Sequence, residues 1–293
     1  MNTKSGSPPE RNHAEAEQLR LGGMALHNGL LIHSPGYWAA AVRDDSGGIS
    51  VASGKKRTPL GGRALDKYPL LRGVVRLADA LAVLPEVKSK LGQAVLPIES
   101  SRVAATIGVT SLLTAVLRRG DGDSVLRQEL SAVLLSLAPA VLALKNSSLA
   151  GYHGAEHRGI GEYERWIKGG EGRVAKEHDR CGSNLVGPLL ATNLVGNVLM
   201  RRVRRRPGPV ATLLTGLVSL GTAMEAFRWM SRHPESTLAR AVSSPGYVLQ
   251  KFLTTEEPTE GQMEVARAAL REILEQEGRP WEEKASSASA SSS

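Results

Sequence analysis

The chain has 293 residues, of which 41% are apolar and 23% are charged, and its formal net charge is +8 at pH 7. Only 4% of the residues are aromatic, so the core must be built mainly from Leu, Val and Ala. The single cysteine, Cys181, excludes an intrachain disulfide and a four-cysteine zinc or iron–sulfur site. No run of 18 or more consecutive apolar residues occurs, so the simplest signature of a membrane span is missing.

One domain, residues 21–283, is expected between two tails. Residues 1–20 are polar and lack apolar periodicity, and residues 284–293 are rich in Ala and Ser, so both ends are predicted to be disordered. Within residues 21–60, strand-like segments at 25–32, 37–42 and 49–52 are separated by turn signals. We therefore predict a small β element of three antiparallel strands, on which His27 and His33 are ordinary strand residues.

Residues 61–283 are predicted to be helical, which makes the fold mainly α. Apolar residues within 69–84 recur at helical spacing and predict an amphipathic helix. About four uncharged apolar stretches follow, at 103–117, 130–144, 185–200 and 209–224. Each measures about 22–24 Å, against a hydrocarbon core of about 30 Å. They are interpreted either as membrane helices extended by snorkelling Arg and Lys side chains, or as buried helices of a soluble protein.

Five arginines at positions 201–206 concentrate the positive charge between two of these stretches. Such a run is typical of a cytoplasmic loop in a membrane protein, and a solvated turn is the alternative. No aromatic stacking residues or recognition helix accompany it, so nucleic acid is not expected as a partner. The positive-inside rule would also place the N-terminal region outside the cell without a signal-peptide core, and this conflict favours shallow or re-entrant helices.

The segment 152–157 reads YHGAEH and contains the motif H-x-x-E-H. His153 and His157 are four residues apart, so on a helix both imidazoles lie on one face and can bind the same ion. In this motif Glu156 accepts a proton from water at the metal. Gly154 lowers the helix propensity by about 1 kcal/mol. The alternative interpretation is an exposed polar helix face.

His178 and Cys181 follow at the spacing H-x-x-C and offer two more ligands. In a structural site, these two residues together with His153 and His157 would close a tetrahedral zinc shell. A buried, inert thiol is an equally good interpretation of the cysteine, because free cysteines are often buried.

In a catalytic site, the two histidines of the motif are joined by a third ligand, which is Cys181, His178 or Glu225. One position of the metal then stays open, and Glu156 acts as the base. Glu225 interrupts the fourth apolar stretch, so it is either functional or paired, and Arg228 three residues further along the helix is its expected partner.

Three runs of residues resemble a known family: YHGAEH at 152–157, HDRCG at 178–182 and PGYVLQKFLTTEEP at 245–258. They are similar to the YqhQ-like family (domain of unknown function 1385), bacterial proteins often described as metal-dependent enzymes with several predicted membrane helices. Residues 21–35, 69–81 and 225–228 also fit this family. Near the first strand the family usually has Gln and Glu, where this chain has Met24 and Asn28.

The resemblance implies a multi-pass protein of the bacterial cytoplasmic membrane, with the lipid bilayer as its partner. It also implies a metal site at His153, His157, His178 and Cys181, within a metal-binding loop at 152–184, with Glu156 beside it. Together with the motifs, it favours a zinc-dependent hydrolase. The alternative is a non-enzymatic membrane scaffold or assembly factor with a structural metal, and a weaker one is a soluble protein that binds nucleic acid through the arginine run.

Overall fold

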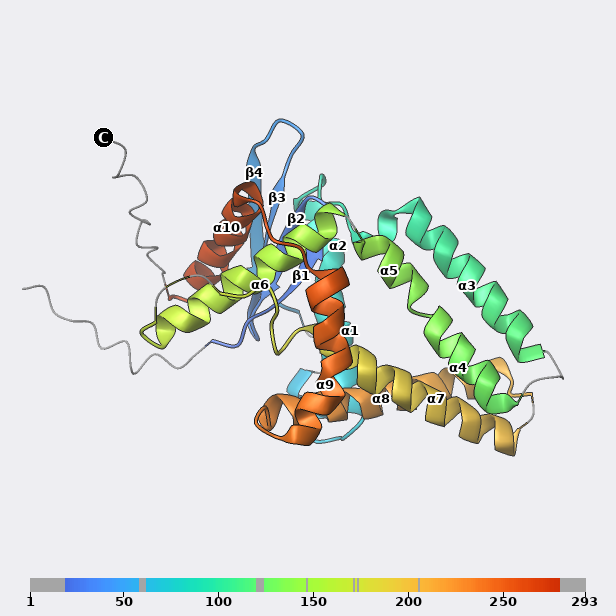
Figure 1. Ribbon diagram of the computed structural model, residues 1–293. Helices are drawn as coiled ribbons and strands as arrows, with labels where there is room; N and C mark the ends of the chain where they lie inside the picture. Colours follow the sequence, from blue (N-terminus) through green and yellow to red (C-terminus); the bar gives the residue numbers. More distant parts are fainter. Residues whose placement is uncertain are drawn as a thin grey trace, which may run out of the picture.

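The structure combines a small β-sheet with a larger set of helices (Figure 1). It is a computed structural model that describes residues 19–57, 62–119, 124–145, 147–170, 172, 174–204 and 206–279. The predicted tails at 1–20 and 284–293 lie outside the described residues, except for positions 19 and 20. Within the described part the mainly α fold is confirmed, and the sheet precedes the helices along the chain.

The sheet has four strands, not the three expected. They form an antiparallel meander in the order β1 (Gly22–Leu26), β2 (Gly29–His33), β3 (Tyr37–Arg43) and β4 (Ile49–Lys55). The prediction of a single strand at 25–32 is wrong, because the chain reverses at His27 and Asn28 and forms two paired strands. The Asn28 side chain stabilises this turn: its oxygen accepts a hydrogen bond from the Val95 N–H at 3.0 Å, and its NH₂ donates to the Gln93 carbonyl at 2.9 Å.

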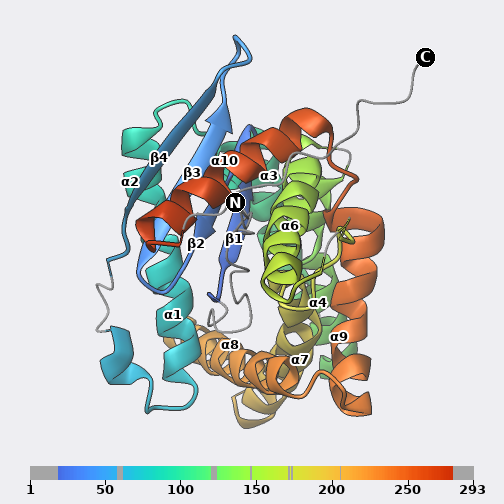
Figure 2. The ribbon, with the colours of Figure 1, turned by 90° about the vertical axis from the view of Figure 1, so that its left-hand side faces the viewer.

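Both faces of the sheet are covered. The helices that cover it are α2 (Leu84–Lys90), α6 (Ser148–Ile167) and α10 (Glu260–Gln276). Leu30 and Ile32 of β2 pack against α6 and α10, whereas Leu31 and Trp38 pack against α2 on the opposite face. Figure 2 shows α10 crossing in front of the sheet, with α2 behind it. Because side chains alternate between two covered faces, the middle of the sheet is apolar at consecutive positions.

The remaining helices include the predicted amphipathic helix and two hairpins. They are α1 (Leu71–Leu81), α3 (Ser101–Arg119), α4 (Val125–Leu135), α5 (Ala138–Leu144), α7 (Val186–Val203), α8 (Pro209–Arg232) and α9 (Thr237–Leu249), with the short helical turns η2 (Gly62–Leu65), η3 (Pro97–Glu99), η4 (Gly182–Leu185) and the π-helical η5 (Gln250–Thr254). One hairpin pairs α3 with α4 and α5, the other pairs α7 with α8, and both extend away from the sheet (Figure 1). Pro139, in the first turn of α5, has no N–H to continue the helix from α4, so the two are separate.

Two segments in the described part of the chain, not about four, are long and apolar enough to cross a membrane. They are Val125–Leu144, which comprises α4 and α5, and Pro209–Arg232, which is α8. The stretches at 103–117 and 185–200 form α3 and α7, but both of these helices end in arginines, so their apolar length is too short. In each candidate span only 22% of the most apolar window is buried, unlike a core helix of a soluble protein. These two helices support a membrane location.

One buried carboxylate connects the two hairpins near their far ends. Glu129 of α4 is 0% exposed, and its oxygens lie 2.7 Å from Nη2 of Arg118 on α3 and 3.1 Å from Nη1 of Arg201 on α7. Arg201 also donates to the Arg118 carbonyl at 3.3 Å. Because α3 and α4 belong to one hairpin and α7 to the other, Glu129 holds the two hairpins in register.

Replacing Glu129 with Gln should destabilise the protein, because two guanidinium groups lose their counter-charge. Breaking a fully buried ion pair costs about 3–5 kcal/mol, and since Arg118 is partly exposed we expect about 2–3 kcal/mol. Thermal unfolding of the detergent-purified protein, followed by circular dichroism, measures the effect. The matched control is Glu235→Gln, because Glu235 pairs with Arg240 but is 90% exposed. Equal midpoints for the two variants would contradict a structural role for Glu129.

Candidate metal centre

Helix α6 positions the two histidines of the H-x-x-E-H motif one turn apart on the same side. The Ser147 hydroxyl begins the helix by accepting a hydrogen bond from the Ala150 N–H. Gly154, which weakened the helix prediction, has a packing role, since a Cβ there would lie 2.1 Å from the Glu256 carbonyl oxygen. The glycine therefore allows the segment after η5 to pass directly against α6.

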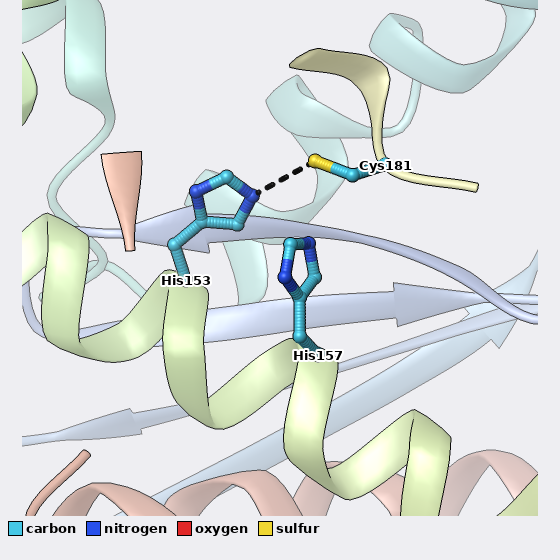
Figure 3. Close-up of side chains that lie close together, drawn as sticks. All are labelled: His153, His157 and Cys181. Carbon is cyan, nitrogen blue, oxygen red and sulfur yellow. Dashed lines mark hydrogen bonds between the residues drawn. The ribbon is translucent and has the colours of Figure 1, made fainter. Parts of the chain in front are cut away.

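His153, His157 and Cys181 come together into one cluster that could hold a metal ion (Figure 3). Their ligand atoms all lie within 4.8 Å of one another, and Nε2 of His153 is 3.4 Å from Sγ of Cys181. Zinc–nitrogen and zinc–sulfur bonds of normal length at a tetrahedral angle place these atoms about 3.5 Å apart. The His153–Cys181 pair therefore already has the spacing that a tetrahedral ion requires, and the donor atom of His157 lies within 4.8 Å of both.

Two backbone carbonyls orient the imidazoles. Nδ1 of His153 lies 2.8 Å from the Thr254 oxygen, and Nδ1 of His157 lies 2.6 Å from the Lys176 oxygen. A carbonyl only accepts hydrogen bonds, so both Nδ1 atoms carry the proton and both Nε2 atoms present a lone pair. Such hydrogen bonds from the second ring nitrogen are typical of metal-binding histidines.

Burial changes the titration of all three side chains. It lowers the pKa of His157 to about 3, with a further contribution from the adjacent His153, and it also lowers the pKa of His153. Burial raises the pKa of Cys181 to about 11, although hydrogen bonds from Ser183 favour the thiolate. At neutral pH the imidazoles are neutral, which is the form that binds metals, whereas the thiol must lose a proton.

Glu156 lies beside the three candidate ligands and is only 5% exposed. A Cβ on Gly23 of β1 would lie 2.6 Å from the Glu156 carboxyl carbon, so the glycine allows the strand to pass directly over this group. Burial raises the pKa of Glu156 to about 7, and the nearby His178 partly opposes this shift. Glu156 therefore exchanges a proton near neutral pH, which is the range that suits a general base.

A cavity of about 220 Å³ connects these groups. Its wall includes Gly22 and Gly23 of β1, His33 of β2, Glu156 and the three candidate ligands. The sheet thus closes one side of the centre, while α6 and the loop that ends at Cys181 close the others. The predicted metal-binding loop at 152–184 is divided accordingly: both histidines lie on helix α6, and only the cysteine comes from the loop.

His178 lines the same cavity but points its ring nitrogens elsewhere. Its Nδ1 accepts a hydrogen bond from the Arg180 N–H at 3.2 Å, and its Nε2 lies 3.7 Å from a carboxylate oxygen of Glu164. Its ring centre is 5.7 Å from that of His157. The structure therefore places His178 next to the three-residue cluster and not among its donor atoms.

Glu225 lies outside the cavity, on helix α8. Its carboxylate accepts two hydrogen bonds from Arg72 of α1, one of them from Nε at 2.7 Å. The ion pair expected from the sequence is thus present, but its partner is Arg72 and not Arg228. The carboxylate joins α1 to α8.

Several residues of the centre escaped the sequence analysis. Gln250 is fully buried, and its side-chain oxygen accepts a hydrogen bond from the His178 N–H at 2.8 Å. His33, interpreted as an ordinary strand residue, lines the cavity with a pKa that burial lowers to about 4. Two features of the sequence could have pointed to the centre: the consecutive glycines at 22–23, which lie in the cavity wall, and the run at 245–258, which contains Gln250. Met24, by contrast, packs on the opposite face of the sheet from the cavity.

Comparison with known protein families places this chain beside proteins without an assigned function. Residues 132–276 match the model of a family described as "Protein of unknown function (DUF1385)". No curated protein and no solved structure matches the chain. The matched residues contain Glu156 and all three members of the candidate metal cluster, whereas the sheet precedes them.

Metal content should depend on the three clustered side chains and not on His178. Protein loaded with zinc should bind one ion, and His153→Ala, His157→Ala and Cys181→Ala should each weaken binding by more than the roughly 10- to 100-fold expected for an outer-shell partner. His178→Ala is the matched control and should retain the ion. Elemental analysis after dialysis measures the content. Unchanged metal in His153→Ala and His157→Ala would exclude this site.

Metal association should also strengthen as the pH rises. The pKa of the Cys181 thiol is about 11, so the ion displaces one proton throughout the neutral and mildly alkaline range. The histidines, with lowered pKa values, are already neutral and release none. The association constant should therefore increase about tenfold per pH unit above neutrality. Competition with a chromophoric chelator measures it, and a constant that does not change with pH would show that the thiol is not a ligand.

Proposed function

The chain belongs to the DUF1385 family, and we propose that it is a membrane-associated hydrolase that uses a divalent metal ion held by His153, His157 and Cys181. One observation carries this proposal. Three residues whose donor atoms could hold a metal ion and a buried carboxyl group with a pKa of about 7 line a single cavity of about 220 Å³.

The donor set favours zinc. Imidazole and thiolate are ligands that zinc accepts readily, whereas magnesium and calcium prefer oxygen. Three protein ligands with one free position are also the usual composition of a catalytic zinc site, since structural sites have four. The directions of the His178 ring nitrogens support the open arrangement, with Cys181 as the third ligand.

The residues of the chain have distinct roles in this proposal. A divalent ion, when bound, polarises water and the reacting group of a substrate. Glu156 accepts the proton of the attacking water and returns it to the leaving group, for which its pKa near 7 is suitable. Thr254 and Lys176 hold the imidazoles through their carbonyls, and β1 keeps bulk water away from the carboxyl group.

The hairpins provide the membrane association. Large apolar side chains are exposed along α3, α8 and the α4–α5 segment, and exposed apolar area of this extent is typical of a lipid-facing surface. The metal centre lies between α6 and the sheet, outside these hairpins. We therefore propose a location in the bacterial cytoplasmic membrane, with the site next to the bilayer and not within it.

A non-enzymatic scaffold with a structural metal is the second candidate function. It is favoured by the way the cluster fastens the loop before η4 to α6, as structural zinc sites do. In that case the carboxyl group of Glu156 has no chemical task. The two functions therefore differ in what the protein requires of Glu156.

Glu156→Gln should abolish hydrolysis while the metal is retained. Purified zinc-loaded protein is assayed with chromogenic ester, phosphodiester and peptide substrates, and loss of the base should lower the rate about 10²- to 10⁴-fold. Glu162→Gln, on the same helix but outside the cavity wall, is the matched control and should be active.

A Glu156→Gln protein that supports the cellular role fully, while His153→Ala does not, would favour the scaffold over the hydrolase.

The membrane location is tested in the same strains, where the protein should stay in the membrane pellet after a carbonate wash. Its release into the supernatant would contradict the proposed location.

A further inference from the structure

A second polar cavity lies at the far ends of the two hairpins, away from the metal centre. It measures about 420 Å³, and its wall includes Arg118 and Arg119 at the end of α3, Arg201 on α7 and Arg206 before α8. Glu129 of α4 is the acidic residue in this wall. The cavity is thus assembled from both hairpins at the point where Glu129 connects them.

The positive charge of this cavity is only partly neutralised. Glu129 pairs with Arg118 and Arg201, while Arg119 and Arg206 are exposed and have no acidic partner within the described part of the chain. The surrounding sequence does not restore the balance, because positions 118–129 and 201–206 together contain eight arginines against three acidic residues. The ion pairs with Glu129 also hold two of the guanidinium groups in place, which prepares the site for an anion.

Exposed apolar side chains stand on the same helix ends, next in the sequence to residues of the cavity wall. Val116 is 57% exposed and Leu117 38% at the end of α3, and Val210 is 68% exposed and Leu213 63% at the start of α8. A ligand in the cavity therefore meets guanidinium groups, and the helix ends around it carry exposed apolar side chains. This polarity is that of an amphiphile with an anionic head.

From this arrangement we propose that the cavity binds the headgroup of an anionic phospholipid. Its phosphate would contact Arg119 and Arg206, while Asn197 and Thr212 in the same wall offer hydrogen bonds to a polar headgroup such as glycerol. Nucleic acid fits less well, because none of the side chains lining the cavity is aromatic and bases would have nothing to stack on. The site is independent of the metal centre, so either can be correct without the other.

The test compares two double variants that remove the same charge. Arg119→Gln with Arg206→Gln changes the cavity, whereas Arg202→Gln with Arg204→Gln changes exposed arginines of the same run outside its wall. Phosphatidylglycerol and phosphatidylcholine are titrated into the detergent-purified proteins, and bound lipid is counted by native mass spectrometry. Both variants should keep the thermal midpoint and metal content of the unaltered protein, which shows that they fold.

The unaltered protein and the Arg202/Arg204 variant should prefer phosphatidylglycerol. In the Arg119/Arg206 variant this preference should fall roughly 10- to 30-fold, since each basic residue near an anionic lipid contributes about a factor of five. Equal losses in both variants would show diffuse charge attraction and overturn the proposal. So would binding of inorganic phosphate as strong as that of the lipid, or a short single-stranded RNA that binds more tightly and displaces it.

Discussion

The candidate metal centre depends on the close contact between helix α6 and two other segments of the chain, one at Lys176 and one at Thr254. The carbonyls of Thr254 and Lys176 fix the imidazoles only because both segments lie against the helix. The Glu256 N–H donates to the Ala150 carbonyl at 3.0 Å, and the Lys176 ammonium group donates to the Thr255 carbonyl at 3.0 Å. The segment after η5 is thus hydrogen-bonded both to α6 and to the loop that contains Lys176. Without these contacts each ring could rotate, and the donor atoms would not converge.

The π-helical geometry of η5 contributes to this arrangement. Its wider turn bonds the Thr255 N–H to the Gln250 carbonyl, five residues back. The chain leaves the helix directly afterwards, so the carbonyl of Thr254 is free to accept a hydrogen bond from Nδ1 of His153. Short π-helical segments are frequent at functional sites.

The parts of the centre that follow from local geometry could be predicted from the sequence. The spacing of His153 and His157 requires only a helix, and the structure provides it. Tertiary contacts decide which further ligands join the two histidines, and the spacing of residues along the sequence does not predict those contacts. His178 is as near in sequence as Cys181, but Glu164 and the Arg180 backbone orient its ring away from the cluster.

The same limit applies to the ion pairs and the sheet. The partner of Glu225 is Arg72, which is 153 residues away in the sequence, whereas local reasoning could only propose Arg228. The sequence does not predict the role of Glu129, because this residue stands just before an apolar stretch and its partners are set by tertiary contacts. In the structure it is the fully buried carboxylate that connects the hairpins. The reversal at Asn28 is different, since Asn followed by Gly is a strong local turn signal and could have been recognised.

The two polar cavities differ in the balance of their charges, and this difference follows from how deeply each is buried. At neutral pH the candidate metal centre holds neutral imidazoles and a protonated thiol, beside a carboxyl group with a pKa of about 7. A divalent ion would displace the thiol proton and favour the charged form of Glu156, so two positive charges meet two negative ones and the buried site stays neutral. A net charge there would be costly, because burial removes the water that would solvate it. The cavity at the hairpin ends opens beside an exposed surface, where an excess of arginines is tolerated until an anionic headgroup neutralises it.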